Sequence, residues 1–306
     1  MTKIRFTKIH GLGNDYIYLS LIPKDANRVE LSDVDLKCLI VRLCRRRFGI
    51  GSDGVILIMP SAECNFKMRI FNPDGSEAEM CGNGIRGLGK YVYDRGLVDS
   101  DLVRIETMAG PRSVQVIETD GKKAVLLRVD MGEPILESRR IPVKSRKKRV
   151  VDEPFKINSN ELRLTCVSMG NPHAVLFVDK SDETITRSGY QMAISTSIVS
   201  DLGSRIERLA IFPNRTNVQF VRILGKDEIE VRTWERGAGE TLACGTGACA
   251  ALVAGVLNGL CGRSAKIHLV GGDLAVEWAG NNHLYLSGPS EEVFQGWITL
   301  EDVQTS

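Results

Sequence analysis

The same unusual sequence pattern before a predicted helix occurs twice in the chain. The stretch FNPDGSEAEMCGNGIRGLGKYV runs over residues 71–92, and WERGAGETLACGTGACAALVAG runs over residues 234–255. In both, an apolar strand end is followed by a glycine-rich turn, a cysteine, Gly-x-Gly and a helix-like run. A shift of 163 residues, about half of the chain, superposes them. The repeat predicts two copies of one supersecondary unit, one in each of two domains.

The superposition also aligns chemically distinctive side chains. It places Arg69 on Arg232, Phe71 on Trp234, Glu77 on Glu240 and Cys81 on Cys244. A single C-G-x-G would favour a buried structural cysteine beside a glycine-rich helix cap. Two copies, each with a glutamate four residues before the cysteine, favour a functional role instead.

A cysteine at the start of a helix has unusual chemistry. The helices predicted to begin at Asn83 and Thr246 leave their first N–H groups unpaired, and the macrodipole makes that end positive. The thiolates of Cys81 and Cys244 should therefore be stabilised, with thiol pKa values below the usual value of about 8.5. The same N–H groups can bind a carboxylate. Each unit is expected to combine a reactive sulfur with an anion-binding site.

Two such units suit inversion at a carbon atom. If the domains face each other, Cys81 and Cys244 would lie on opposite sides of a small amino acid in a cleft. One thiolate would remove the α-hydrogen, and the other thiol would return a proton to the opposite face. Helix N-termini directed at the α-carboxylate would stabilise the carbanion in a water-poor pocket.

Further polar residues suit a zwitterionic ligand. Primary amides, which donate to carboxylates and accept from ammonium groups, lie in turns marked by glycine or proline: Asn14, Asn72, Asn171 and Asn217. Each asparagine alone could be an ordinary turn residue. Glu235 and Arg236 supply one charge of each sign at a strand end, enough for a second amine and carboxylate. His173 could tune a thiol or could be a turn histidine with satisfied hydrogen bonds.

Composition excludes several classes of partner. The net charge of +2 gives no argument for nucleic acid or a membrane surface. We identify no signal peptide or membrane-spanning stretch, so a cytoplasmic location is expected. The eight cysteines form no C-x-x-C pair, so no metal site is expected, and they should be thiols in a reducing compartment. Cys38 and Cys44 fall on an amphipathic pattern opened by Ser32 or Asp33, which predicts core packing for both.

Short strands dominate the predicted elements. The strand candidates are 4–9, 54–60, 66–71, 103–108, 113–118, 124–130, 162–168, 174–179, 218–223, 228–234, 265–270, 274–278, 283–287 and 297–301. The helix candidates are 33–47, 83–95, 198–208 and 246–259. The last is apolar on nearly all sides, which predicts full burial. The polar segment 134–160 lacks periodicity and is predicted to be a linker.

Six motifs together resemble the successive signatures of the diaminopimelate epimerase family. They are HGLGNDYIYL, FGIGSDG, RIFNPDGSEAEMCGNGIRGLGKY, MGNPHAV, FPNRTNVQFV and WERGAGETLACGTGACAA, in the family's order over nearly the whole chain. The resemblance implies an α+β fold of the α/β roll type. Two pseudo-symmetric domains would each wrap a mostly antiparallel sheet around a central helix, with the active site in the cleft between them.

The resemblance also implies an activity, the epimerisation of LL-2,6-diaminopimelate to the meso isomer without a cofactor, for lysine and peptidoglycan synthesis. Cys81 and Cys244 would be the acid–base pair. The reacting carboxylate would bind the amides of Gly82, Asn83, Gly245 and Thr246. The rest of the substrate would bind Asn14, Asn72, Asn171, Asn217, Glu235 and Arg236. His173 and Glu235 would adjust the thiol pKa values.

The domain boundaries expected from this pattern are 1–131, with 290–306 returning to that domain, and 132–289. Three features depart from the family. Gly54 stands where some members carry a glutamine that touches substrate, and the segment 181–210 is longer than usual. Phe294 replaces a tyrosine associated with dimer formation, although a homodimer is still expected.

Three alternatives stay open. One is another two-cysteine racemase, for proline or hydroxyproline, against which the charged pair Glu235 and Arg236 argues. Another is a non-enzymatic anion- or nucleotide-binding protein, although neither glycine-rich turn has the full dinucleotide fingerprint and no P-loop motif is present. The third is a pyridoxal-phosphate racemase, in which the two-cysteine mechanism would leave the cofactor no task.

Overall fold

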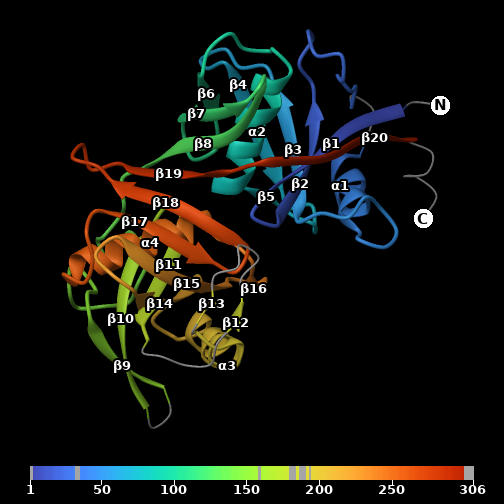
Figure 1. Cartoon of the computed structure of the whole chain (residues 1–306). Helices are drawn as coiled ribbons and strands as arrows, with labels where there is room; N and C mark the ends of the chain where they lie inside the picture. Colours follow the sequence, from blue (N-terminus) through green and yellow to red (C-terminus); the bar gives the residue numbers. More distant parts are fainter. Residues whose placement is uncertain are drawn as a thin grey trace. The chain divides into compact units, whose positions relative to one another are not determined.

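The computed structural model describes residues 3–31, 35–157, 160–178, 184–185, 191–192 and 194–299. The chain divides into two compact units (Figure 1). One unit takes in Met1–Val129 and Gly288–Ser306, and the other is Asp130–Ser287. Within the described residues, no helix is both long enough and apolar enough to cross a membrane.

The first unit is a mixed sheet built around one helix. Its strands are β1 (Lys3–Gly11), β2 (Asn14–Ser20), β3 (Gly54–Met59), β4 (Phe66–Phe71), β5 (Glu77–Ala78), β6 (Leu102–Glu106), β7 (Arg112–Asp120), β8 (Lys123–Gly132, which runs past the unit boundary) and β20 (Glu291–Thr299). Most neighbours are antiparallel, but β2–β3 and β4–β6 are parallel. Helix α2 (Gly82–Asp94) packs against β1, β2, β4 and β7. The last strand, β20, pairs antiparallel with β1.

The second unit repeats this plan. Its strands are β9 (Glu153–Ile157), β10 (Asn160–Ser168), β11 (Pro172–Phe177), β12 (Thr184–Ile185), β13 (Gln191–Met192), β14 (Asn217–Ile223), β15 (Glu228–Glu235), β16 (Gly239–Thr241), β17 (Ser264–Leu269), β18 (Gly272–Trp278) and β19 (Leu284–Pro289, which crosses the boundary). Helix α4 (Gly245–Leu257) packs against β10, β11, β14, β15, β17 and β18. As predicted from its composition, α4 is buried on all sides from Gly245 to Gly255.

The pairing order of the two sheets matches strand for strand. In the first unit β1–β2 is antiparallel, β2–β3 parallel, β3–β4 antiparallel and β4–β6 parallel. In the second unit β10–β11, β11–β14, β14–β15 and β15–β17 follow the same sequence of directions. A short strand, β5 or β16, pairs with β4 or β15 just before each central helix. The predicted α+β fold of two pseudo-symmetric domains is thus confirmed.

The remaining helices cover the sheets from outside. Helix α1 (Leu36–Cys44) buries Leu39, Ile40 and Leu43 against residues of β1 to β4, and α3 (Thr196–Glu207) packs against β14 to β16. The predicted start of α1 was wrong. The N-cap is Asp35, whose carboxylate accepts from the Cys38 N–H at 3.1 Å, while Ser32 and Asp33 lie outside the described residues. Cys44 is buried as predicted, but Cys38 is exposed, with its sulfur directed at Asp35.

Two other predictions of local structure were wrong. The segment 134–160 is not a linker, because Ile141, Val143 and Val150 belong to the second unit's core and β9 lies within the segment. Its apolar residues are irregularly spaced, so no period of 2 or 3.6 marks them. Strand β2 was missed because nearly every residue in it is buried, which removes the alternation that identifies a half-exposed strand. Most of the segment 181–195 lies outside the described residues.

Candidate active site, described unit by unit

Cys81 is the N-cap residue of α2. Its backbone is extended, with φ −138° and ψ 121°, and its sulfur accepts from the Gly84 N–H at 3.4 Å. The predicted carboxylate-binding residues Gly82 and Asn83 are the first two residues of the helix. Their N–H groups belong to the first turn, where no intrahelical acceptor exists. The sequence therefore placed the sulfur, and the amides expected to bind an anion, at the start of the helix.

Asn14, at the start of β2, lies beside Cys81. The Cys81 sulfur donates to Asn14 Oδ1 at 3.6 Å, and Asn83 Nδ2 donates to the same oxygen at 3.2 Å. Asn14 Nδ2 donates to Asp53 Oδ2 at 2.9 Å, and Asp53 is held in turn by Arg46. The Asn14 oxygen accepts from donors and its NH2 group donates to a carboxylate, and these partners fix the orientation of the amide.

Asn72, also predicted to bind substrate, lies in the turn between β4 and β5. Its Nδ2 donates to Ser76 Oγ at 2.9 Å, and its N–H bonds the Ser76 carbonyl at 2.8 Å. Gly75 closes this turn with φ +80°, a conformation that favours glycine. Asn72 is exposed, and the short strand β5 separates it from Cys81 along the chain.

Cys244 is the N-cap residue of α4, as Cys81 is of α2. Its sulfur lies 3.5 Å from Thr246 Oγ1, and either group can be the donor. Unlike Cys81, it makes no side-chain capping bond to its own helix. Gly245 and Thr246 are the first two helical residues, in the positions of Gly82 and Asn83.

A polar chain leads from Cys244 to His173. Asn171 Nδ2 donates to Thr246 Oγ1 at 3.2 Å, and Asn171 Oδ1 lies 2.9 Å from His173 Nε2. Burial lowers the pKa of His173 to about 3, with the charge of Arg236 acting in the same direction and the Gln219 side chain opposing the shift. His173 is therefore neutral at physiological pH and is linked to the thiol through Asn171 and Thr246.

The other predicted residues of the second unit lie at the ends of adjacent strands. Asn217 Oδ1 accepts from the Arg236 N–H at 2.9 Å, and Asn217 pairs with His173 in the parallel β11–β14 register. Glu235 Oε1 accepts from Thr241 Oγ1 at 2.7 Å. The Arg236 guanidinium donates to the Asn214 carbonyl at 3.0 Å. The strand ends thus bring together His173, Asn217 and Arg236.

The third residue after each cysteine is a glycine because neighbouring atoms leave no room for a Cβ atom there. A Cβ on Gly84 would lie 2.7 Å from Ile56 Cδ1, and a Cβ on Gly247 would lie 2.9 Å from Gln219 Nε2 and 3.3 Å from Cys244 Sγ. The second glycine of each C-G-x-G therefore allows close packing of the helix on the sheet and, at Gly247, on the sulfur.

Two residues beside Cys81 were not predicted. The Tyr16 hydroxyl donates to the Cys81 sulfur at 3.4 Å, and the fully buried Arg86 donates to Asn83 Oδ1 at 2.7 Å. Strand alternation puts Tyr16 on the same face of β2 as Asn14, which was a usable signal. The contact with Cys81 depends on sheet order, which the sequence did not provide.

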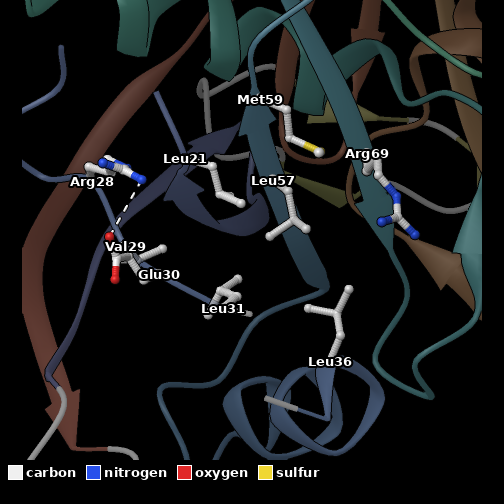
Figure 2. Close-up of a pocket in the computed structure, with 9 residues that line it drawn as sticks. All are labelled: Leu21, Arg28, Val29, Glu30, Leu31, Leu36, Leu57, Met59 and Arg69. Carbon is white, nitrogen blue, oxygen red and sulfur yellow. Dashed lines mark ion pairs between the residues drawn. The ribbon is translucent and has the colours of Figure 1, made fainter. Parts of the chain in front are cut away.

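A cavity of about 530 Å³ lies elsewhere in the first unit (Figure 2). It is lined by Leu21, Arg28, Val29, Glu30, Leu31, Leu36, Leu57, Met59 and Arg69. Its walls are mainly apolar, Arg28 pairs with Glu30 at 3.5 Å, and no predicted site residue lines it. Among the described residues, no cluster of three or more His, Cys, Asp or Glu side chains could hold a metal ion.

Comparison with known proteins decides the family. The sequence model for diaminopimelate epimerase matches residues 6–137 and 165–293, which include both cysteine motifs. The chain belongs to the diaminopimelate epimerase family. The diaminopimelate epimerase of Acetivibrio thermocellus is 48% identical over 98% of this chain and all of the relative. That of Pelotomaculum thermopropionicum is 49% identical, over 96% of this chain and 98% of its own.

Solved structures support the fold alone. A probable proline racemase from Agrobacterium radiobacter superposes with a TM-score of 0.69 over 99% of this chain and 94% of its own. Its sequence is only 16% identical, so the likeness carries no information about substrate. The family's relatives are epimerases, which makes the chain an enzyme of the isomerase class.

Proposed function

We propose that the chain interconverts LL- and meso-2,6-diaminopimelate by a two-base mechanism in which Cys81 and Cys244 are the acid–base pair. The observation that carries the proposal is that both cysteines are N-cap residues of equivalent helices, α2 and α4. Family membership and the names of the relatives support the substrate.

The chemistry balances without a cofactor. One thiolate takes the α-hydrogen as a proton, and the electron pair of the broken C–H bond stays on the α-carbon. The other cysteine, as a thiol, gives its proton to the opposite face, and a new C–H bond forms with inverted configuration. Nothing is oxidised or reduced, and the two sulfurs exchange roles in the reverse direction.

The carbanion needs electrostatic stabilisation. In the proposal, the first N–H groups of α2 and α4, from Gly82 and Asn83 and from Gly245 and Thr246, receive the carboxylate next to the reacting carbon. Charge delocalised into that carboxylate would be stabilised by both helix ends.

The remaining polar residues would bind the distal amino-acid end and set the stereochemistry. Those assigned are Asn14, Asn72, Asn171, Asn217, Glu235 and Arg236. Glu235 and Arg236 supply the opposite charges that a second ammonium and carboxylate require. Neutral His173 would act on the Cys244 thiol only indirectly, through Asn171 and Thr246.

The decisive test is turnover of LL-diaminopimelate in deuterium oxide by the wild type, Cys81→Ala and Cys244→Ala. The wild type should form the meso isomer with deuterium at the α-carbon. Each variant should lose at least about a thousandfold in rate, as expected when an acid or base is removed, while circular dichroism shows a folded chain. Full activity in either variant, or turnover of proline instead, would contradict the proposal.

We further propose a cytoplasmic homodimer. Val293, Phe294 and Trp297 on β20 are about half exposed, at 52%, 44% and 58%, and suit a surface that a second copy would cover. Sedimentation velocity of the wild type and of Trp297→Glu tests this. A dimer that Trp297→Glu dissociates supports it, and a monomeric wild type contradicts it.

A further inference from the structure

Three buried polar side chains of the second unit have atoms that no hydrogen bond of normal length reaches within the described residues. His173 and Gln219 are fully buried, and Thr233 is 2% exposed. The atoms are His173 Nδ1, Gln219 Oε1, Gln219 Nε2 and Thr233 Oγ1. Burial of an unsatisfied polar group is costly, so four such atoms on three residues require a physical explanation.

The three residues lie side by side on one face of the sheet. Gln219 on β14 is directly opposite Thr233 on β15, and Val175 on β11 is directly opposite Gln219. His173 is two residues from Val175, so its side chain is on the same face. Helix α4 begins over this face, because a Cβ on Gly247 would lie 2.9 Å from Gln219 Nε2. Neighbouring side chains in such a row are within reach of one another.

A neutral His173 can donate only one hydrogen bond. Burial lowers its pKa to about 3, so the ring carries a single N–H at physiological pH. Its Nε2 lies 2.9 Å from Asn171 Oδ1, an amide oxygen that can only accept. The N–H is therefore on Nε2, which leaves Nδ1 as an acceptor that needs a donor.

Gln219 can supply that donor from its amide nitrogen. As placed, the Gln219 side chain opposes the lowering of the His173 pKa, as an amide oxygen facing the ring does. A neutral ring that donates to Asn171 has no second N–H for that oxygen. The two ends of an amide have nearly the same shape, and a half-turn brings Nε2 to the ring. Oε1 can then accept from the Thr233 hydroxyl, so that all four atoms have a partner.

The tautomer of His173 sets the direction of the hydrogen bonds that lead to Cys244. Asn171 Oδ1 accepts from His173, so Asn171 Nδ2 faces Thr246 Oγ1, to which it donates at 3.2 Å. The Thr246 hydroxyl keeps its own hydrogen to donate, and the Cys244 sulfur lies 3.5 Å away. Other contacts of the sulfur leave this count unchanged, because it concerns the Thr246 hydroxyl.

We propose that Gln219 is a positioning residue, whose amide donates to His173 Nδ1 and holds His173 in the tautomer with its hydrogen on Nε2. The hydrogen bonds that follow then direct the Thr246 hydroxyl hydrogen at the Cys244 sulfur. The catalytic consequence rests on the proposed two-cysteine function. The hydroxyl stabilises the thiolate when Cys244 acts as a base, and it leaves the thiol hydrogen for the substrate when Cys244 acts as an acid.

The test reads the tautomer of His173 in the enzyme without substrate. Histidine labelled with nitrogen-15 gives distinct NMR signals for ring nitrogens with and without hydrogen. The chain has four histidines, and His173→Gln identifies the signals of His173 by their loss. The wild type near pH 7.5 should have hydrogen on Nε2 and none on Nδ1. Hydrogen on Nδ1, or on both nitrogens, would overturn the inference.

Gln219→Met tests the residue itself. Methionine has a similar length but cannot donate, so the second tautomer is no longer excluded and a mixture of the two should appear. Gln115→Met, at an exposed position on β7, is the matched control and should keep the wild-type signals. Thr233→Val removes the donor to Gln219 Oε1 and should shift the tautomers the same way if Gln219→Met does not fold. A folded Gln219→Met enzyme with the wild-type tautomer would contradict the proposal.

Kinetics separate this inference from the proposed function. Thr246→Val removes the hydroxyl and should lower kcat about tenfold, the equivalent of one hydrogen bond to a charged group, whereas Thr246→Ser should restore most of it. Gln219→Met should lower kcat by a smaller factor. Mixed tautomers with unchanged kcat would overturn the catalytic consequence. If Cys244→Ala stays active, the proposed function fails, while the tautomer measured without substrate still decides the role of Gln219.

Discussion

Arg69 and Glu77 form a two-point ion pair across the turn that leads to Cys81. Arg69 Nε donates to Glu77 Oε1 at 2.8 Å, and Nη2 donates to Oε2 at 2.9 Å. Arg232 and Glu240 repeat the pair before Cys244, with Nε donating to Oε1 at 2.7 Å. In both units the arginine is on the long strand and the glutamate is on the short one, β5 or β16.

Breaking either pair should lower kcat, and breaking the partly exposed Arg69–Glu77 pair should leave the free energy of unfolding nearly unchanged. Strand β5 has two residues and ends three residues before Cys81, so the ion pair fixes the backbone segment that leads into the cysteine. We expect Glu77→Gln and Glu240→Gln each to reduce kcat about tenfold, because small displacements of a reacting group are costly. The Glu77 pair is partly exposed, so its removal should cost less than about 1 kcal/mol of unfolding free energy.

The control for this prediction is Asp201→Asn. It breaks an ion pair of similar length, Asp201 to Arg205 at 2.7 Å, whose two residues are exposed on α3. Steady-state kinetics and urea denaturation should be measured on all three variants. Unchanged kcat in both glutamate variants, or an equal loss in Asp201→Asn, would rule out a positioning role.

Asp53→Ala should impair catalysis through Asn14. Asp53 Oδ2 accepts from Asn14 Nδ2 at 2.9 Å and from the Asp15 N–H at 3.1 Å. Without that acceptor the Asn14 amide can rotate, and its carbonyl can no longer be held toward Cys81 and Asn83. We expect kcat/KM to fall about tenfold, the equivalent of one charge-assisted hydrogen bond. Asp53→Asn keeps an acceptor oxygen and should recover most activity; equal losses in both variants would contradict this explanation.

His173 should make stability depend on pH. Its pKa is about 3 in the folded chain and close to 6.5 when exposed, so the unfolded chain binds the extra proton between these values. Stability is therefore complete above pH 6.5 and is lost as the pH falls. At pH 5 this histidine alone should reduce the unfolding free energy by about 2 kcal/mol.

The measurement for His173 compares the wild type with His173→Gln in urea at pH 5 and pH 7.5. The glutamine does not titrate, so the variant should lose less stability between the two pH values, whatever its absolute stability. Identical losses would show that His173 is protonated, or accessible, in the folded chain.

The repeat was the most informative part of the sequence. Cys81 and Cys244 could be placed at helix starts because glycine spacing and strand endings are local signals. The segment around Ile141, Val143 and Val150 was misassigned because its core residues follow no period and are held by irregular backbone bonds, such as the Val143 N–H to Ser138 O at 2.6 Å. Cys38 was misassigned because the buried stripe of α1 is Leu39, Ile40, Leu43 and Cys44, and Cys38 lies to one side of that stripe.

Contacts between residues that lie far apart in the chain could not be predicted from the sequence. Tyr16 and Cys81 are separated by 65 positions, and their contact depends on β2 lying beside the start of α2. Arg86 gave a misleading signal, since a charged residue in an amphipathic helix is usually exposed. Only the packing of α2 inside the sheet shows that it is buried.

Replacing Gly247 and Gly84 by alanine should separate sulfur positioning from packing. A Cβ at Gly247 would lie 3.3 Å from Cys244 Sγ and 2.9 Å from Gln219 Nε2, so the sulfur must shift by a few tenths of an ångström. A Cβ at Gly84 would meet Ile56 Cδ1 at 2.7 Å but Cys81 Cβ only at 3.5 Å.

We expect Gly247→Ala to lower kcat at least about tenfold. Gly84→Ala should mainly lose stability, by about 1–3 kcal/mol from overpacking, because helix propensity returns only about 1 kcal/mol. Kinetics and urea denaturation of both variants test this, and a normal kcat in Gly247→Ala would show that α4 accommodates the methyl group without moving Cys244.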